Sequence, residues 1–141
     1  MKDTSKFSVK PYILKVDKPW GFELIFSDGS TKVTSKLLHV TAGRRSSLQF
    51  HDTKEEILTL ISGEGILELE DSLGNIQKFN MELRKSYLIL PNQIHRFSAG
   101  QTDCEIMEAS TPEKGNTVRL EDDYKRGIET ESDRQNARQK F

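Results

Sequence analysis

From about residue 12 to residue 109 the chain consists of short runs rich in aliphatic, aromatic and β-branched residues, several of which alternate with polar ones. Each run is bounded by Gly, Pro, Asn, Asp or Ser, which is the pattern of strands separated by tight turns. The runs predicted to form strands cover residues 12–16, 21–27, 32–40, 46–50, 56–62, 65–71, 75–80, 86–91, 95–99 and 104–110. Many short strands at this spacing are typical of a sandwich or barrel, so we predict an all-β domain.

The clearest alternation is LELE at residues 67–70, in which Leu67 and Leu69 are expected to face a core while the two glutamates face water. Residues 71–75 then form a predicted hairpin loop, because Gly and Asn tolerate the left-handed conformation that such loops need. Asp28-Gly29 predicts a second hairpin.

The composition changes after Pro112, where charged residues dominate and apolar ones become rare. We expect a packed segment around residues 118–124, followed from about residue 129 by a solvated tail that could form a frayed helix. The expected parts are an N-terminal arm or edge strand (1–15), a barrel (16–112) and a C-terminal segment with a charged tail (113–141).

Size and charge limit the possible functions. With 141 residues, of which 34% are hydrophobic, the chain is long enough for one core and too short for two ordinary domains. The 21 Lys and Arg nearly balance the 22 Asp and Glu, so no electrostatic footprint for nucleic acid or membrane is present. No run resembles a signal peptide or a membrane span, and the single Cys104 excludes an internal disulfide. We therefore expect a cytoplasmic protein.

The segment from Gly43 to Gly63 carries the candidate chemistry. Gln49 and His51 lie two apart on a predicted strand, so their side chains leave the same face, and Glu56 opens the next strand beside them. His95 is far along the chain, after a Pro-Asn pair suited to a sharp turn that would aim it inward.

These four side chains offer two imidazole nitrogens, an amide oxygen and a carboxylate. That donor set suits one divalent metal ion, with Zn favoured and Mn, Fe, Co or Ni as other choices. The alternative is a degenerate pocket without metal, in which Gln49, His51, Glu56 and His95 are structural. His39 alternates with apolar neighbours in a strand and is interpreted as a strand histidine rather than a ligand.

The spacing Gly43-x5-Gln49-x-His51-x4-Glu56-x6-Gly63, followed by Asn92-x2-His95, resembles the two cupin motifs. This resemblance implies a double-stranded β-helix, or jelly-roll barrel, with a metal at its centre. The Gln-x-His pair narrows the likeness to mannose-6-phosphate isomerases. Three further stretches, at residues 18–22, 47–56 and 117–126, are similar to the C-terminal cupin domain of the type II enzymes, here expected as a stand-alone small cupin.

The resemblance implies a metal-dependent cupin that acts on a sugar or sugar phosphate, with aldose-ketose isomerisation as the expected reaction. The chain departs from the type II pattern in the loop after the ligand histidine, where Asp52, Thr53 and Lys54 replace a segment resembling His-His-Arg. Two alternatives stay open: a non-catalytic module that binds a sugar or nucleotide sugar in polysaccharide metabolism, and a metal-dependent dioxygenase.

Lys54 is the candidate general base by its place in this loop, provided that its pKa is lowered. Arg44, Arg45 and Lys54 are candidate contacts for an anionic substrate group. Exposed edge strands near the N-terminus also lead us to expect a homodimer.

Overall fold

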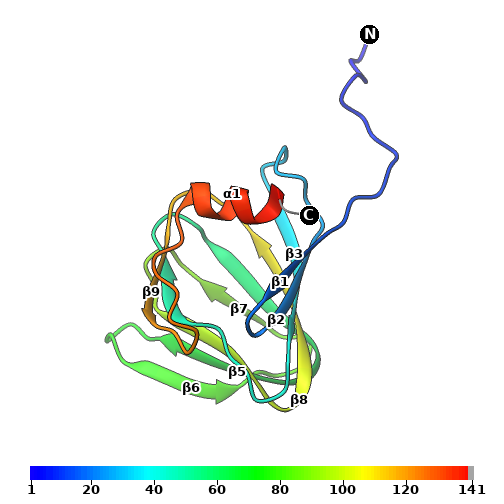
Figure 1. The fold of residues 1–141 in the computed structure, drawn as a ribbon. Helices are drawn as coiled ribbons and strands as arrows, with labels where there is room; N and C mark the ends of the chain where they lie inside the picture. Colours follow the sequence, from blue (N-terminus) through cyan, green and yellow to red (C-terminus); the bar gives the residue numbers. More distant parts are fainter. Residues whose placement is uncertain (140–141) are drawn as a thin grey trace.

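The computed structural model describes residues 1–139, which form nine strands and one helix. The elements are β1 (Leu14–Lys18), β2 (Gly21–Ile25), β3 (Thr34–Val40), β4 (Leu48–His51), β5 (Glu56–Glu70), β6 (Ile76–Asn80), β7 (Ser86–Ile89), β8 (His95–Ser110), β9 (Thr117–Glu121) and α1 (Glu131–Gln139). The strands form one sheet, in which every pair between named strands is antiparallel, and the sheet curls into a barrel (Figure 1). The all-β prediction is confirmed.

Two long strands, β5 and β8, give the barrel its two layers. The first half of β5 pairs with β7 and with the last part of β8, whereas its second half pairs with β6 and with the first part of β8. The strand order β1-β2-β3-β8 then continues one layer, and β8-β4-β9 continues the other. Both layers therefore share the same two strands.

The sequence predicted two strands in place of β5 and two in place of β8, because glycines interrupt each run. In the structure the pairing continues through these glycines, with irregularities between Leu60 and Ser62 and between Gly63 and Gly65. Gly63 has a φ of 78°, and a Cβ there would clash with the carbonyl oxygen of Asp103 on β8. The glycine thus permits close approach of two backbones within a bulge, and it does not end the strand.

The inward-facing side chains change in character along the barrel. Leu38 on β3 lies opposite Ile106 on β8 within the apolar core, and two residues along each strand Lys36 lies opposite Glu108. All four side chains are buried. The core residues are Trp20, Leu38, Val40, Leu58, Leu60, Leu67, Met81, Ile89, Phe97, Ala99, Cys104 and Ile106. One half of the interior is therefore an apolar core, and the other half holds buried charges.

Both expected hairpins are present. Gly74, between β5 and β6, has a φ of 81°, and Gly29, between β2 and β3, has a φ of 91°. The side chain of Asp71 accepts hydrogen bonds from the backbone N–H groups of Leu73 and Asn75, which fixes the first loop.

The C-terminal segment contributes more to the barrel than its composition suggested. β9 pairs with β4, so the sheet extends beyond the boundary expected at residue 112. α1 lies across one end of the barrel (Figure 1), where Arg134 is buried and forms ion pairs with Glu113 and Glu129. Thr130 and Asp133 exchange hydrogen bonds as a capping box at the start of this helix. The helix that the tail was expected to form is therefore present over Glu131–Gln139 and docks through Arg134, while most of its other side chains are exposed. Residues 140–141 of the expected tail lie outside the described residues.

At the other end of the chain, residues before β1 extend away from the barrel (Figure 1). β1 is the terminal strand of the sheet order, and a homodimer formed through this edge stays a prediction. Of the described residues, no helical segment has both the length and the apolar character required of a membrane span.

Candidate metal centre

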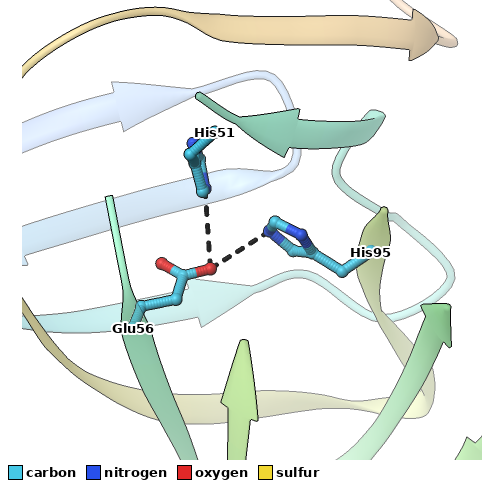
Figure 2. A group of neighbouring side chains, drawn as sticks. All are labelled: His51, Glu56 and His95. Atoms are coloured by element: carbon cyan, nitrogen blue, oxygen red, sulfur yellow. Dashed lines mark ion pairs between the residues drawn. The ribbon is translucent and has the colours of Figure 1, made fainter. Parts of the chain in front are cut away.

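Three buried side chains from three strands converge in the charged half of the barrel. His51 ends β4, Glu56 begins β5 and His95 begins β8. Their candidate ligand atoms all lie within 4.8 Å of one another. Figure 2 shows both imidazole rings directed at the same carboxylate oxygen, with distances to Glu56 Oε1 of 3.5 Å from His51 Nε2 and 3.1 Å from His95 Nε2.

The local sequence explains why these residues meet. The loop of residues 52–55 turns the chain from β4 into β5, which brings the end of one strand beside the start of the next. Asn92 has a φ of 68°, as its residue type allows, and its backbone N–H donates to the carbonyl of His51 at 2.7 Å. This turn delivers His95 to β8 opposite Gln49 on β4.

His95 carries the strongest sign of a cation site. Its Nδ1 lies 3.0 Å from the carbonyl oxygen of Gln93, which can only accept a hydrogen bond. In the neutral ring this contact places the hydrogen on Nδ1 and leaves a lone pair on Nε2. That Nε2 is buried without a hydrogen-bond partner, although Glu56 Oε1 is close by. Two electron-pair donors therefore face each other, an arrangement that a metal ion between them would satisfy.

His51 is held in the same manner. Its Nδ1 lies 2.9 Å from Thr117 Oγ1 on β9, which leaves Nε2 turned toward Glu56. Burial, together with the positive charge of Lys54, lowers the pKa of His51 to about 4. The ring is therefore neutral near pH 7, which is the form that coordinates metals.

Gln49 and His51 both line a cavity inside the barrel, and their side chains leave the same face of β4. Its Oε1 accepts a hydrogen bond of 2.6 Å from Ser47 Oγ. An amide oxygen has two lone pairs, so this bond leaves one for a cation. Gln49 as the fourth ligand stays a prediction, and the residues present fit the divalent ions expected from the sequence.

Lys54 is buried between two carboxylates, which changes the role expected for it. Its Nζ lies 3.1 Å from Glu56 Oε2 and 3.2 Å from Glu108 Oε2. Burial alone would lower the pKa of Lys54, but the charges of Glu108 and Glu56 outweigh it and raise the pKa. A lysine that keeps its proton is unsuited to the base role that the sequence suggested, because that role needed a lowered pKa.

The pKa of Glu108, which lies on the other side of Lys54, is raised as well. Burial raises the pKa of this carboxyl to about 7, even though the charge of Lys54 works in the other direction. Glu108 also lines the cavity and is 4% exposed. A carboxyl with its pKa raised in this way can exchange a proton near neutral pH.

The two arginines expected to contact an anionic substrate are not among the residues that line the cavity. Arg45 forms a bidentate ion pair with Asp123, and Arg44 donates to the backbone carbonyl of Pro19. Seven other cations line the cavity beside five glutamates: Lys18, Lys36, Lys54, Arg119, Arg126, Arg134 and Arg138. Lys54 is thus the one expected substrate contact that lies at the cavity.

Sequence reasoning did not identify several buried charges around the site. Lys36 lies between Glu23 at 2.9 Å and Glu113 at 2.8 Å, and its side chain is 4% exposed. The signal was present in the alternation: Lys36 shares the inward face of β3 with Leu38, as Glu108 shares that of β8 with Ile106. A charged residue at an inward position of an amphipathic strand indicates a polar cavity.

This buried ion pair leads to a stability prediction. Lys36→Met removes the cation between Glu23 and Glu113 and leaves two carboxylates buried without it. We expect the free energy of unfolding to fall by about 3 to 5 kcal/mol, as for other broken buried pairs. Urea unfolding followed by circular dichroism measures the change.

The matched control is Lys85→Met, which breaks the exposed ion pair between Lys85 and Glu82, whose side chains are 65% and 66% exposed. An exposed pair contributes about 0 to 1 kcal/mol, so this variant should unfold almost as the wild type does. Equal losses in the two variants would show that the buried charges do not depend on Lys36.

The remaining histidine lies outside the site, as expected. His39 on β3 stacks on Phe22 with ring centroids 4.6 Å apart, and its nitrogens lie 3.2 Å from Glu105 and 3.1 Å from Asp103. Trp20, by contrast, is buried against Phe97 and forms part of the apolar wall of the cavity.

No protein-family model matches this sequence, and a search of curated proteins finds no match. Solved structures do match. CapF from Staphylococcus aureus, described as a capsular polysaccharide assembling protein, is 15% identical with a TM-score of 0.64, over 91% of this chain and 34% of that chain. Oxalate decarboxylase from Lactobacillus farciminis is 16% identical with a TM-score of 0.69, over 84% of this chain and 38% of that chain. KdgF from Halomonas sp. is 14% identical with a TM-score of 0.59, over 69% of this chain and 84% of that chain.

The chain thus spans little more than a third of the length of CapF and of oxalate decarboxylase. None of the three structures is a mannose-6-phosphate isomerase, so that closer likeness stays a prediction. All three have the cupin fold, which agrees with the expected jelly-roll barrel. By its strand arrangement and by these structural matches, the chain has the cupin fold.

Proposed function

We propose that this chain is a divalent-metal-binding cupin that acts on a sugar or sugar phosphate, with aldose-ketose isomerisation as its reaction. The observation that carries the metal part of the proposal is the partnerless Nε2 of His95, buried opposite Glu56 Oε1. His51, Glu56 and His95 are the proposed ligands, together with Gln49. Zn²⁺ remains our first choice, and Mn²⁺ is the ion named for one oxalate decarboxylase of similar fold.

A structural match and the charges of the cavity support a carbohydrate ligand. CapF is described as assembling capsular polysaccharide, and its fold is similar to that of this chain. Basic and acidic side chains both line the cavity. The basic ones can donate hydrogen bonds to the hydroxyl groups of a sugar, and the acidic ones can accept hydrogen bonds from them.

The reaction needs a group that takes a proton from a carbon beside a carbonyl. A bound divalent ion would supply a Lewis acid that polarises the carbonyl oxygen. Glu108 is the proposed base, because its pKa of about 7 allows it both to accept and to return a proton near neutral pH. Lys54 links Glu108 to the proposed ligand Glu56 and so holds both carboxylates in place.

The proposal is tested by metal analysis and by turnover assays. Protein purified without added metal should contain about one divalent ion per chain, measured by elemental analysis. It should then convert at least one member of a panel of hexose and pentose phosphates into the ketose, detected by coupled assay or by NMR. Chain without bound metal, even after incubation with Zn²⁺ or Mn²⁺, would contradict the metal site.

A non-catalytic sugar-binding module is the second candidate, favoured by the raised pKa of Lys54, which removes the base that the sequence offered. It predicts stoichiometric metal and saturable sugar binding without any turnover on the panel. Turnover on the panel therefore separates the two candidates.

A further inference from the structure

The cavity beside the proposed ligands is too small to hold a sugar phosphate alone. Its volume is about 80 Å³, whereas sites for small molecules usually measure about 300 to 1,000 Å³. A second cavity, of about 300 Å³, adjoins it and shares Lys18, Arg119, Arg126 and Glu129 with it. These shared residues therefore lie where the two cavities meet.

Arg119 has a donor that the protein does not use. Its side chain is 10% exposed, its Nη1 donates to the carbonyl of Gly127 at 2.8 Å, and its Nη2 to Glu129 Oε2 at 3.3 Å. Its Nε is buried without an acceptor. A buried donor on a charged group that lacks an acceptor is costly, and an oxyanion is the acceptor that a guanidinium matches best.

The charges around Arg119 are of both signs, because Asp17, Glu129 and Asp133 line the second cavity beside Lys18, Arg119 and Arg126. Burial, together with the positive charge of Arg126, lowers the pKa of Arg119, so the two guanidinium groups repel each other in a poorly solvated place. Arg126 is held by Asp122, which occupies its Nε and Nη2. Lys18 approaches the same region and pairs with Glu23 at 3.3 Å.

The register of β9 fixes the distance from this cluster to the ligand residues. Thr117 lies opposite His51, and Arg119 lies opposite Gln49, so the two β9 residues face the strand that carries two proposed ligands. Residues two apart on a strand are separated by about 7 Å and point to the same side. Arg119 therefore lies two residues along β9 from Thr117, the residue that orients His51.

We propose that Lys18, Arg119 and Arg126 form an oxyanion-binding subsite at the junction of the two cavities. It takes the phosphate or carboxylate group of a ligand whose other end reaches His51, Glu56 and His95. That the ligand also reaches a metal ion rests on the proposed function, whereas the oxyanion subsite rests on the contacts of Arg119. The substrate class that follows is a short polyhydroxy compound with an oxyanion at one end.

The subsite can be tested directly at the unused N–H group. In the full chain with one equivalent of Zn²⁺, the Nε–Hε signal of Arg119 is followed by ¹H–¹⁵N NMR and is assigned by its absence from Arg119→Lys. Sodium phosphate and sodium acetate are titrated in turn, with sodium chloride at equal ionic strength as the reference. We expect a saturable shift with phosphate, with acetate or with both, and none with chloride; the anion that binds more tightly identifies the class.

Calorimetric titration of the same anion adds a comparison of variants. Arg119→Lys keeps the charge but loses Nε–H and the planar fork, and we expect binding about 10- to 100-fold weaker, as for the loss of a hydrogen bond to a charged group. Arg45→Met is the matched control, because Arg45 pairs with Asp123 outside the cavity, and it should bind the anion as the wild type does.

Absence of a saturable shift in the wild type, or a shift that chloride reproduces, would overturn the subsite. Undiminished binding by Arg119→Lys would do the same. Metal content, measured on the same samples, keeps the two proposals apart: anion binding at Arg119 in a chain that retains no metal would uphold the subsite and contradict the proposed function.

Discussion

His95→Ala should abolish stoichiometric metal binding. The substitution removes the nitrogen whose lone pair faces Glu56 and leaves His51 and Glu56 as the remaining members of the converging group. Changes to residues that merely orient a ligand already weaken metal affinity by about 10- to 100-fold, so loss of a ligand should cost at least that much. Elemental analysis after dialysis, and competition with a chromogenic chelator, measure the loss.

His39→Ala is the matched control, because His39 is the remaining histidine of the chain and lies on the outer face of β3. It should keep one metal ion per chain. Thermal unfolding of both variants shows whether His95→Ala still folds. A folded His95→Ala protein with wild-type affinity would mean that the three residues converge for structural reasons alone.

Glu108→Gln should lower the rate of turnover by about 10²- to 10⁴-fold, the range typical for loss of a positioned general base. Glutamine keeps the size of the side chain but cannot accept a proton. In the wild type, kcat/KM should rise as pH increases through about 7, because the base acts when it is ionised. The variant should lack this rise and retain its metal, since Glu108 is not one of the proposed ligands.

The same substitution has an effect on stability that does not require activity. The pKa of Glu108 is raised in the fold, so its contribution to stability is present below about pH 4.5 and is lost as pH rises through about 7. Wild type should therefore lose stability relative to Glu108→Gln over that interval. Glu105→Gln, on the outer face of β8 beside His39, is the control, and it should change neither the turnover rate nor the metal content. A Glu108→Gln protein with full turnover would exclude Glu108 as the base.

The sequence predicted the fold and the convergence of His51, Glu56 and His95, whose role as metal ligands stays a proposal. Alternation placed Leu67 inside, Gln49 and His51 shared a face because they are two apart on a strand, and Asn92 could take a positive φ. Each of these inferences needs only the neighbouring residues.

The remaining features depend on contacts between distant residues. Arg45 was expected to contact an anionic substrate because it is basic. It instead forms a bidentate ion pair with Asp123, which lies 78 residues further along the chain. The pKa of Lys54 depends on Glu108, which is 54 residues away. No local pattern tells whether a charge will meet a partner across a barrel, so these roles required the structure.

β9 was not predicted as a strand, for a related reason. Its sequence, TVRLE, is short and lies in a segment dominated by charge. Pairing with β4 and burial of Thr117 stabilise it as a strand, and both depend on residues in the first half of the chain.

The two long strands that bend through both layers also determine how the chain can fold. Glu56 pairs with Ser110, and Leu69 pairs with His95, so the backbone ladder between β5 and β8 joins positions that are distant in the chain. Loops of this length must close before the ladder gains any hydrogen bond, which is the condition that makes β-rich topologies slow to fold. Because both layers share β5 and β8, we expect the barrel to fold as one cooperative unit, in which His51, Glu56 and His95 come together only when it is complete.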